Sequence, residues 1–371
     1  MNKLYVLSLL VSFNIITGAE KGNIVKNADY TCTSISVADD EEKVSTAFFS
    51  ASGKKCAAIA QLNKTYLTSL ALTEEKPFKK TTLTSSTNEF GWCGTFNNTE
   101  KLLAIGRDKD GIELWDTQTG RHMHSIQAYE VPYENLDCIS SLHFTKQEFH
   151  LAVGHTNSLL PVKIFDIEKS HAVTTFENTY NAGIASIAIN ANNTLLISFE
   201  ESKSPLVIWD YRQRKVCAQL VQADGIIKAL ASNNDNKIIL GQTKKIDDVI
   251  SPRGVNAHIT VLDTRTNNSL WNTSTFYDAK NCSSLPTMGS VAITDDSTSA
   301  FSSMSCYLNQ YSVSANTAEP VVYQGHSDKI THILVPAKDV VYTVAADKMM
   351  RIWNINKQQE VKKRSGRCIT M

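Results

Sequence analysis

Two groups of residues have a spacing that suits metal chemistry. His122 and His124 lie two positions apart, so on a strand both side chains would point to one face and share an ion. Asp108, Asp110 and Gly111 resemble part of a calcium-binding loop, but the glutamate that closes such a loop is missing. An exposed outer strand for the histidines and a tight turn for the aspartates account for both groups. We therefore expect no metal site here.

The sequence lacks the other common catalytic motifs. It contains no glycine-rich phosphate loop, no His-Glu-x-x-His motif and no nucleophile elbow. None of its 8 cysteines forms a Cys-x-x-Cys pair, so a structural zinc site is not expected. Four cysteines lie on predicted strands, where we expect them to be small buried residues: Cys56, Cys138, Cys217 and Cys306. These patterns predict a protein that uses no cofactor and is not an enzyme.

Charge and composition exclude further classes of protein. The 37 lysines and arginines balance the 37 aspartates and glutamates, so the formal net charge is zero. Proteins that bind nucleic acid through its phosphates need a basic surplus, and we therefore expect no nucleic-acid partner. The 16 glycines and 8 prolines among 371 residues are too few for a collagen-like or low-complexity chain. What remains is an ordinary globular protein whose role depends on its surface.

A recurring strand organises the chain. An alternating apolar segment, which ends in Asp or a related polar residue, returns roughly every 45 residues. Its copies are Ile112–Asp116, Val162–Asp166, Leu206–Asp210, Ile259–Asp263, Asn309–Ser312 and Met350–Asn354. A period of about 45 residues with four strands in each unit is the signature of a β-propeller blade.

The last of these units resembles the WD40-repeat family. Its residues follow the family pattern in order and in approximate spacing: Gly325-His326, Thr343, Asp347 and Trp353-Asn354. The resemblance implies that this histidine, threonine, aspartate and tryptophan form a hydrogen-bonded network inside the blade. A buried histidine needs such partners, and an aspartate acceptor fixes its tautomer.

The other units depart from this pattern. Only Trp115-Asp116 and Trp209-Asp210 repeat the full Trp-Asp dipeptide, and no second Gly-His pair stands at the equivalent position. We therefore expect the remaining blades to be held mainly by apolar packing, and the tryptophans at the ends of strands to belong to the core.

A degenerate first unit fits upstream of these six. Its predicted strands are Val44–Ser52, Cys56–Gln61, Thr65–Leu72 and Phe78–Thr84. The sequence thus predicts an all-β protein, a seven-bladed WD40-type β-propeller with four antiparallel strands per blade, over residues 44–364. Either Tyr30–Val37 or Gln359–Arg364 supplies the strand that closes the ring, and the sequence leaves both open. Residues 20–43 form an N-terminal segment that contains the first of these strands, and residues 365–371 form a tail.

Residues 1–19 have the features of a secretory signal peptide. Lys3 precedes a mostly apolar run, Leu4–Ile16, which is followed by small residues up to Ala19. The run is shorter than a transmembrane helix. We predict cleavage after Ala19 and a secreted or periplasmic protein.

The C-terminal tail supports a competing prediction. Cys368 is the fourth residue from the end, and Ile369 and Met371 fit a prenylation motif. The basic segment Lys362–Arg364 would supply the second membrane signal that a single lipid needs. A lipid on Cys368 would give a membrane-anchored cytoplasmic scaffold. An exported chain does not meet a cytosolic prenyltransferase, so the two predictions exclude each other.

The longest predicted loops indicate where a partner would bind. In a propeller, the loops from strand b to strand c and from strand d to the next blade share one face. Three of them are predicted to be long: Ala128–Asp137, Lys244–Ala257 and Phe276–Thr287. They carry aromatic and charged residues of the kinds that anchor partners. The candidate partner-binding residues are Tyr129, Tyr133, Glu134, Lys244, Lys245, Arg253, Tyr277 and Asp278.

These observations favour a non-enzymatic scaffold that binds a protein or peptide on a face built from loops. The alternative is a propeller enzyme of the hydrolase or quinoprotein type in the export compartment. Such an enzyme needs histidines and carboxylates at the mouth of the channel, and the predicted inner strands supply few of them: His143 and His332.

Overall fold

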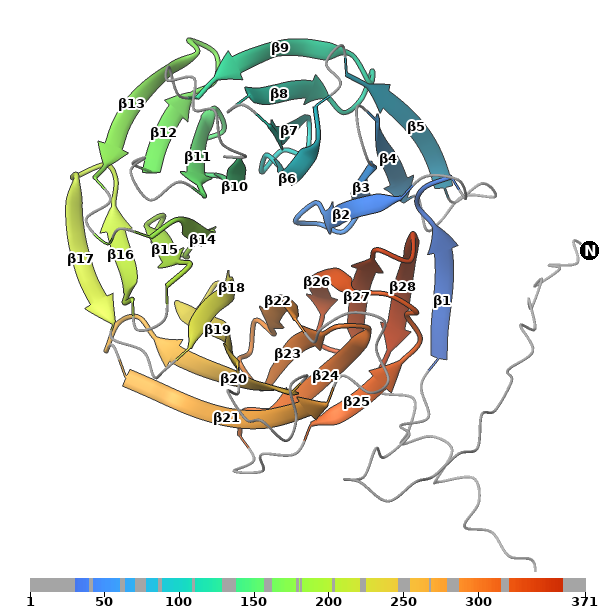
Figure 1. The fold of residues 1–371 in the computed structure, drawn as a ribbon, viewed down its shortest axis with the longest axis vertical. Helices are drawn as coiled ribbons and strands as arrows, with labels where there is room; N and C mark the ends of the chain where they lie inside the picture. Colours follow the sequence, from blue (N-terminus) through green and yellow to red (C-terminus); the bar gives the residue numbers. More distant parts are fainter. Residues whose placement is uncertain are drawn as a thin grey trace, which may run out of the picture.

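The computed structural model describes residues 31–39, 43–60, 64–70, 78–85, 89–108, 111–128, 138–156, 162–177, 180, 182–201, 204–220, 225–245, 254–266, 268–278, 287–314 and 320–355. These residues form seven antiparallel sheets of four strands each. The sheets stand as blades in a closed ring around a central opening (Figure 1). The predicted all-β, seven-bladed propeller is therefore confirmed.

The blades are numbered 1 to 7 from Val44, and the strands of each blade are named a to d from the channel outward. Blade 1 contains β2 (Val44–Phe49), β3 (Lys55–Ala60), β4 (Lys64–Leu70) and β5 (Phe78–Thr84), and blade 2 contains β6 (Gly91–Phe96), β7 (Leu102–Arg107), β8 (Gly111–Asp116) and β9 (His122–Gln127). Blade 3 contains β10 (Ile139–Phe144), β11 (His150–His155), β12 (Val162–Asp166) and β13 (His171–Phe176), and blade 4 contains β14 (Ile184–Ile189), β15 (Leu195–Phe199), β16 (Leu206–Asp210) and β17 (Lys215–Leu220). Blade 5 contains β18 (Ile226–Ser232), β19 (Lys237–Lys245), β20 (Gly254–Asp263) and β21 (Asn268–Asp278), and blade 6 contains β22 (Met288–Ile293), β23 (Ser299–Met304), β24 (Tyr307–Ser312) and β25 (Val321–Gln324). Blade 7 contains β26 (Ile330–Ala337), β27 (Val340–Ala345), β28 (Met349–Asn354) and β1 (Thr31–Ser36).

The N-terminal strand β1 closes the ring. It pairs with β28 as the outer strand of blade 7, with Cys32 opposite Trp353. Val37 and Ala38, which follow the strand, are buried in the cluster between blades 7 and 1. The chain therefore uses the first of the two closing strands that the sequence left open. The other, Gln359–Arg364, lies outside the described residues.

The burial of each strand follows from its position in the blade. The b strands β7 and β15 are buried at every residue, because a strand flanks each edge and a blade covers each face. Their sequences are accordingly mostly apolar, with Arg107 at the end of β7 and Ser198 within β15 as the polar exceptions. The outer strand β17 alternates between exposed and half-buried residues, as expected of a strand with one face in solvent. The apolar clusters join neighbouring blades: Phe48 of blade 1 packs in one cluster with Leu103 of blade 2.

Hydroxyl groups on the inner strands add hydrogen bonds between blades. The Ser45 hydroxyl of β2 lies 3.1 Å from the Gly91 carbonyl oxygen of β6. The Thr331 hydroxyl of β26 lies 2.9 Å from the Ala47 carbonyl oxygen of β2, which links the last blade to the first. Ser141 of β10 accepts a hydrogen bond from a backbone N–H of blade 4 at 3.0 Å. These bonds hold the inner strands around the channel in a fixed spacing.

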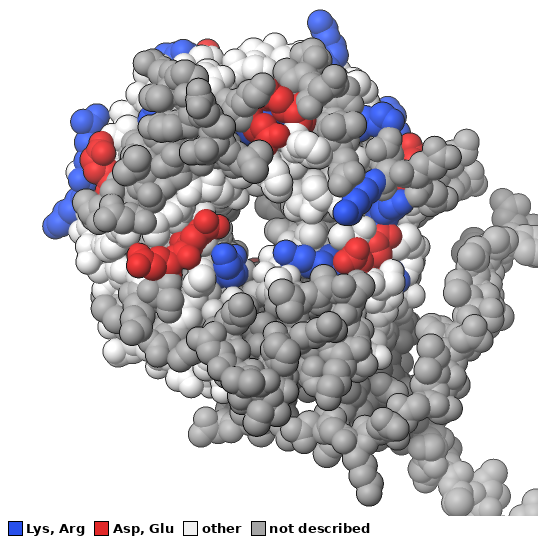
Figure 2. Space-filling view, in the orientation of Figure 1, with Lys and Arg blue, Asp and Glu red and all other residues white. Residues whose placement is uncertain are grey.

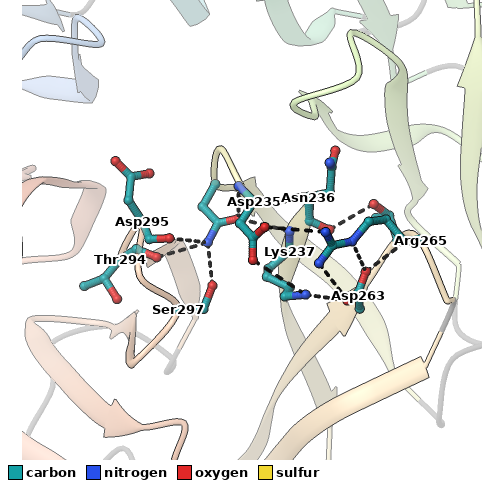
Figure 3. A network of polar contacts seen from close by, with 10 residues as sticks. Asp235, Asn236, Lys237, Asp263, Arg265, Thr294, Asp295 and Ser297 are labelled. Atoms are coloured by element: carbon teal, nitrogen blue, oxygen red, sulfur yellow. Dashed lines mark hydrogen bonds and ion pairs between the residues drawn. The ribbon is translucent and has the colours of Figure 1, made fainter.

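Polar contacts also join blades 5 and 6 (Figure 3). They lie on the face of the ring where strand a connects to strand b and strand c connects to strand d. The Asn233 side-chain amide donates to the Thr294 carbonyl oxygen at 3.1 Å and to the Ser297 hydroxyl at 2.8 Å. Within blade 5, Lys237 forms a buried ion pair with Asp263. All these groups bond to one another within the turns, so we assign this network to the stability of the ring.

Candidate functional site

Two exposed aromatic side chains lie at the start of β6, the inner strand of blade 2. Phe90 is 40% exposed and Trp92 is 50% exposed, and their ring centroids are 6.3 Å apart. The other tryptophans of the chain are buried: Trp115, Trp209, Trp271 and Trp353. Trp92 is exposed because a β-bulge lies between Gly91 and Cys93, and a bulge turns a side chain out of the regular alternation.

Asp108 fixes both aromatic residues in place. Its carboxylate accepts the indole N–H of Trp92 and, at 3.2 Å, the backbone N–H of Phe90. The backbone N–H of Asp108 donates to the Phe90 carbonyl oxygen at 3.0 Å. Asp108 is thus the turn residue that the sequence predicted between strands b and c, and it also orients the exposed pair. The Trp92 indole and the backbone of Phe90 are therefore held in place before any partner arrives, which lowers the entropy cost of binding.

A buried ion pair lies next to this segment. Arg107 is 1% exposed, and its Nε and Nη2 donate to Oε2 of Glu113 at 3.0 and 2.8 Å. Arg107 Nη1 donates to the Glu89 carbonyl oxygen at 3.3 Å, and the indole N–H of Trp115 donates to the same Glu113 oxygen at 3.3 Å. Blade 2 is therefore held by a charged network as well as by apolar packing.

The four residues that the WD40 resemblance singled out lie in one chain of hydrogen bonds in blade 7. His326 Nδ1 lies 2.9 Å from Asp347 Oδ2, and His326 Nε2 lies 2.7 Å from the Thr343 hydroxyl. The indole N–H of Trp353 donates to the same hydroxyl at 2.7 Å. The Asp347 carboxylate can only accept, so the neutral imidazole carries its proton on Nδ1, and Nε2 accepts the hydroxyl proton of Thr343.

Burial sets the protonation of this network. It lowers the pKa of His326, although the neighbouring Asp347 works in the opposite direction. Burial alone would raise the pKa of Asp347, but hydrogen bonds from His326 and from backbone N–H groups hold that pKa below its ordinary value. Every polar atom in the network has a partner inside the blade, so the arrangement is structural.

The aspartates that recur at the ends of the c strands cap the following turns. Asp116 Oδ1 accepts the backbone N–H groups of Gln118 at 2.9 Å and Thr119 at 2.7 Å. Asp166 and Asp210 accept backbone N–H groups in the same way. Local hydrogen bonds of this kind are why aspartate favours turns. The repeating motif thus reflects turn formation and carries no chemistry of its own.

Comparison with known families identifies the group to which the chain belongs. A family model described as the N-terminal domain of Nucleolar protein 10-like proteins matches residues 48–247, more than half of the chain. The chain belongs to this family. The matched segment runs from blade 1 into blade 5 and includes the exposed aromatic pair and the buried ion pair. No curated protein matches the chain.

The structure corrects the predicted position of four candidate partner-binding residues. Lys244 and Lys245 lie on β19, and Tyr277 and Asp278 lie on β21, where the sequence predicted loops. Hydrogen-bonded pairing continues along β19, β20 and β21 to Lys245 and Asp278, beyond the end of the apolar alternation. The Nucleolar protein 10-like match ends at residue 247, just past β19. The other four candidates lie outside the described residues: Tyr129, Tyr133, Glu134 and Arg253.

The extended strands of blade 5 reach the same face as the aromatic pair. Strand b ends and strand c begins on that face, and strand d leaves it for the next blade, so Lys245, Gly254 and Asp278 lie at one end of the sheet. Phe90 precedes an inner strand and therefore lies at the corresponding end of blade 2. The extended ends of the blade 5 strands and the aromatic pair thus belong to one face of this Nucleolar protein 10-like propeller.

The histidine pair of β9 does not form a shared ligand site. His122 Nε2 lies 3.1 Å from the Ser125 hydroxyl, and His124 Nε2 lies 2.9 Å from the Ile167 carbonyl oxygen. In the part of the chain that the structure describes, no three histidine, cysteine or acidic side chains come together as metal ligands. The same residues contain no helix of the length and apolarity needed to cross a membrane.

The cysteines differ in burial more than the sequence predicted. Six cysteines lie within the described residues: Cys32, Cys56, Cys93, Cys138, Cys217 and Cys306. Cys56 is buried as predicted, and Cys138 and Cys306 are half-buried. Cys217 is exposed, because it lies on the outer strand β17, and for this residue the prediction was wrong.

Proposed function

We propose that this protein is a non-enzymatic scaffold that binds a protein partner on the face formed by the b–c and d–a connections. The observation that carries the proposal is the exposed aromatic pair of Phe90 and Trp92 at the start of the inner strand β6, with the Trp92 indole held by Asp108. Tryptophan dominates the energetic centres of protein interfaces, and an exposed apolar pair marks a contact surface. The membership of the chain in a β-propeller family agrees with a scaffold role.

Site-specific photo-crosslinking in the native host tests this proposal. The photoreactive residue benzoylphenylalanine replaces Phe90 in one variant. In the control it replaces Phe149, an exposed phenylalanine in the a–b turn of blade 3 on the opposite face. We expect one discrete crosslinked protein from position 90 and none of that mass from position 149. Equal crosslinking at both positions, or none at position 90, contradicts the proposal.

The predicted loops give a second readout of the same proposal. We expect Tyr133→Ala and Arg253→Ala each to reduce the crosslink from position 90 without lowering the thermal unfolding temperature. If both variants leave the yield unchanged, the loops that carry these residues do not contribute to the binding face.

We also propose that the scaffold is exported. Cleavage after Ala19 would leave β1 whole, so the mature chain would retain its ring-closing strand. The family is named after a nucleolar protein, and the nucleolus is the competing location. The intact mass of the native protein separates the possibilities. Loss of residues 1–19 supports export and a retained N-terminus contradicts it. An isoprenoid on Cys368 would instead identify a membrane-anchored cytoplasmic scaffold.

A further inference from the structure

The surroundings of the exposed aromatic pair are acidic. Among the described residues, the charged side chains on the segments that hold the pair are one cation, Arg107, and three carboxylates: Glu89, Asp108 and Glu113. Arg107 and Glu113 are buried and paired with each other, whereas Glu89 and Asp108 are partly exposed. Figure 2 shows acidic side chains gathered over blade 2, beside the central opening.

The basic side chains at the inner strands of this face belong to other blades. Lys228 lies in blade 5, with its ammonium 3.9 Å from a carboxylate oxygen of Glu200 in blade 4. Lys329 and Lys43 directly precede the inner strands of blades 7 and 1. The negative charge at blade 2 is therefore local, although the net charge of the whole chain is zero.

We propose that the partner presents an arginine side chain to this site, within a peptide segment that lies along the mouth of the channel. This inference rests on the proposed function and names the chemistry of the partner. A guanidinium group is planar and stacks on an indole face, and it also forms hydrogen bonds with carboxylates. Trp92 supplies the indole, which is half exposed, and Asp108 supplies the carboxylate.

Asp108 has the acceptor capacity that this role requires. Its two oxygens accept one N–H each from Trp92 and Phe90, and a carboxylate offers about four acceptor positions. The carboxylate can therefore hold the indole and still accept a donor from a guanidinium group. The same acidic surroundings disfavour a nucleic acid, because phosphates would approach two carboxylates.

Fluorine NMR on the full chain tests the inference directly. The protein is labelled with 5-fluorotryptophan, and Trp92→Phe assigns one of the 5 tryptophan signals to Trp92. The probes are a capped Gly-Arg-Gly-Arg-Gly peptide, the same peptide with citrulline in place of arginine, and a hexauridylate. We expect the arginine peptide to shift the Trp92 signal alone. The citrulline peptide, which has the same shape without the charge, should bind about tenfold more weakly.

Charge variants provide matched controls on the same face. Glu89→Gln removes one carboxylate beside the aromatic pair, and we expect it to weaken the arginine peptide about two- to fivefold. Glu200→Gln removes a carboxylate of blade 4, which lies beside Lys228 of blade 5. It should leave the affinity for the arginine peptide unchanged. Equal effects of the two substitutions, or equal binding of the arginine and citrulline peptides, overturn the inference.

The remaining outcomes separate this inference from the proposed function. If the crosslink from position 90 forms but no arginine peptide shifts the Trp92 signal, the scaffold stands and the arginine-bearing partner is wrong. A shift with hexauridylate and none with the peptide also overturns the inference, in favour of base stacking. If the arginine peptide shifts the Trp92 signal but no crosslink forms in the host, the proposed scaffold function is wrong, although the site does bind arginine.

Discussion

The Thr343 hydroxyl is the central atom of the hydrogen-bonded network in blade 7. Replacing it by the isosteric valine leaves His326 Nε2 without a donor and the indole N–H of Trp353 without an acceptor, and both groups are buried. We expect Thr343→Val to lower the free energy of unfolding by about 2–4 kcal/mol. Thr68 supplies the control: its buried hydroxyl has no hydrogen-bond partner among the described residues, so Thr68→Val should be neutral or stabilising. Urea denaturation measures both, and equal costs would contradict a structural role for the network.

For the buried ion pair of blade 2, replacing one partner should cost more stability than replacing both. Glu113→Gln leaves the Arg107 guanidinium buried beside a neutral group, and removing one partner of a buried pair costs about 3–5 kcal/mol of stability. Replacing both residues, as Arg107→Met with Glu113→Gln, removes the unpaired charge and should cost less than the single change. A double variant that is less stable than Glu113→Gln alone would refute this account. The same denaturation assay compares the two variants.

At the scale of strands and blades, the sequence predicted most of the architecture, because alternation and turn residues specify a strand locally. The predicted strand Phe78–Thr84 coincides with β5. The extension of blade 5 was missed, since the ends of β19 to β21 lack an apolar alternation and depend on pairing with each other. The exposure of Trp92 was missed for a similar reason: it depends on a bulge in β6 and on an aspartate in the following turn. The Phe90-Gly91-Trp92 sequence was the one local signal of that site.

Close packing of inner strands predicts which glycines are required. A Cβ atom on Gly289 of β22 would lie 2.0 Å from the carbonyl oxygen of Ile330, the first residue of β26. Backbone cannot move away without shifting a blade, so we expect Gly289→Ala to cost about 1–3 kcal/mol of stability. Gly111→Ala is the control, because the nearest atom to its added Cβ would be 3.8 Å away. Thermal unfolding of the two variants should therefore differ by several degrees, and identical unfolding temperatures would argue against the contact.

For the whole molecule, the titratable groups predict that acid destabilises the ring in two stages. Burial lowers the pKa of His332 to about 4 and also lowers the pKa values of His143 and His326. The unfolded chain therefore binds more protons than the folded one as the pH falls from about 7 toward 4, and stability decreases over that range. Hydrogen bonds from Thr119 hold the pKa of Asp116 below its ordinary value, so its contribution is lost below about pH 4.

Denaturation midpoints between pH 8 and pH 3 test this dependence. His332→Gln removes one of the groups that take up a proton on unfolding, so the loss of stability between pH 7 and pH 5 should be smaller in that variant. A stability that is constant from pH 8 to pH 4 would show that these histidines titrate alike in the folded and unfolded chain.

Blade 7 is formed by strands from both ends of the described chain. The N-terminal strand β1 completes the blade that otherwise contains β26, β27 and β28. A chain that begins at Asp39 lacks β1, which leaves the long edge of β28 unpaired, and it lacks the buried side chains of Ile35, Val37 and Ala38. An unpaired edge associates with other edges, and the lost burial opens the contact between blades 7 and 1. We expect this chain to unfold at a lower temperature and to self-associate in size-exclusion chromatography. The control begins at Thr31, retains all of β1 and should be monodisperse. If both chains behave alike, ring closure by β1 does not stabilise the propeller.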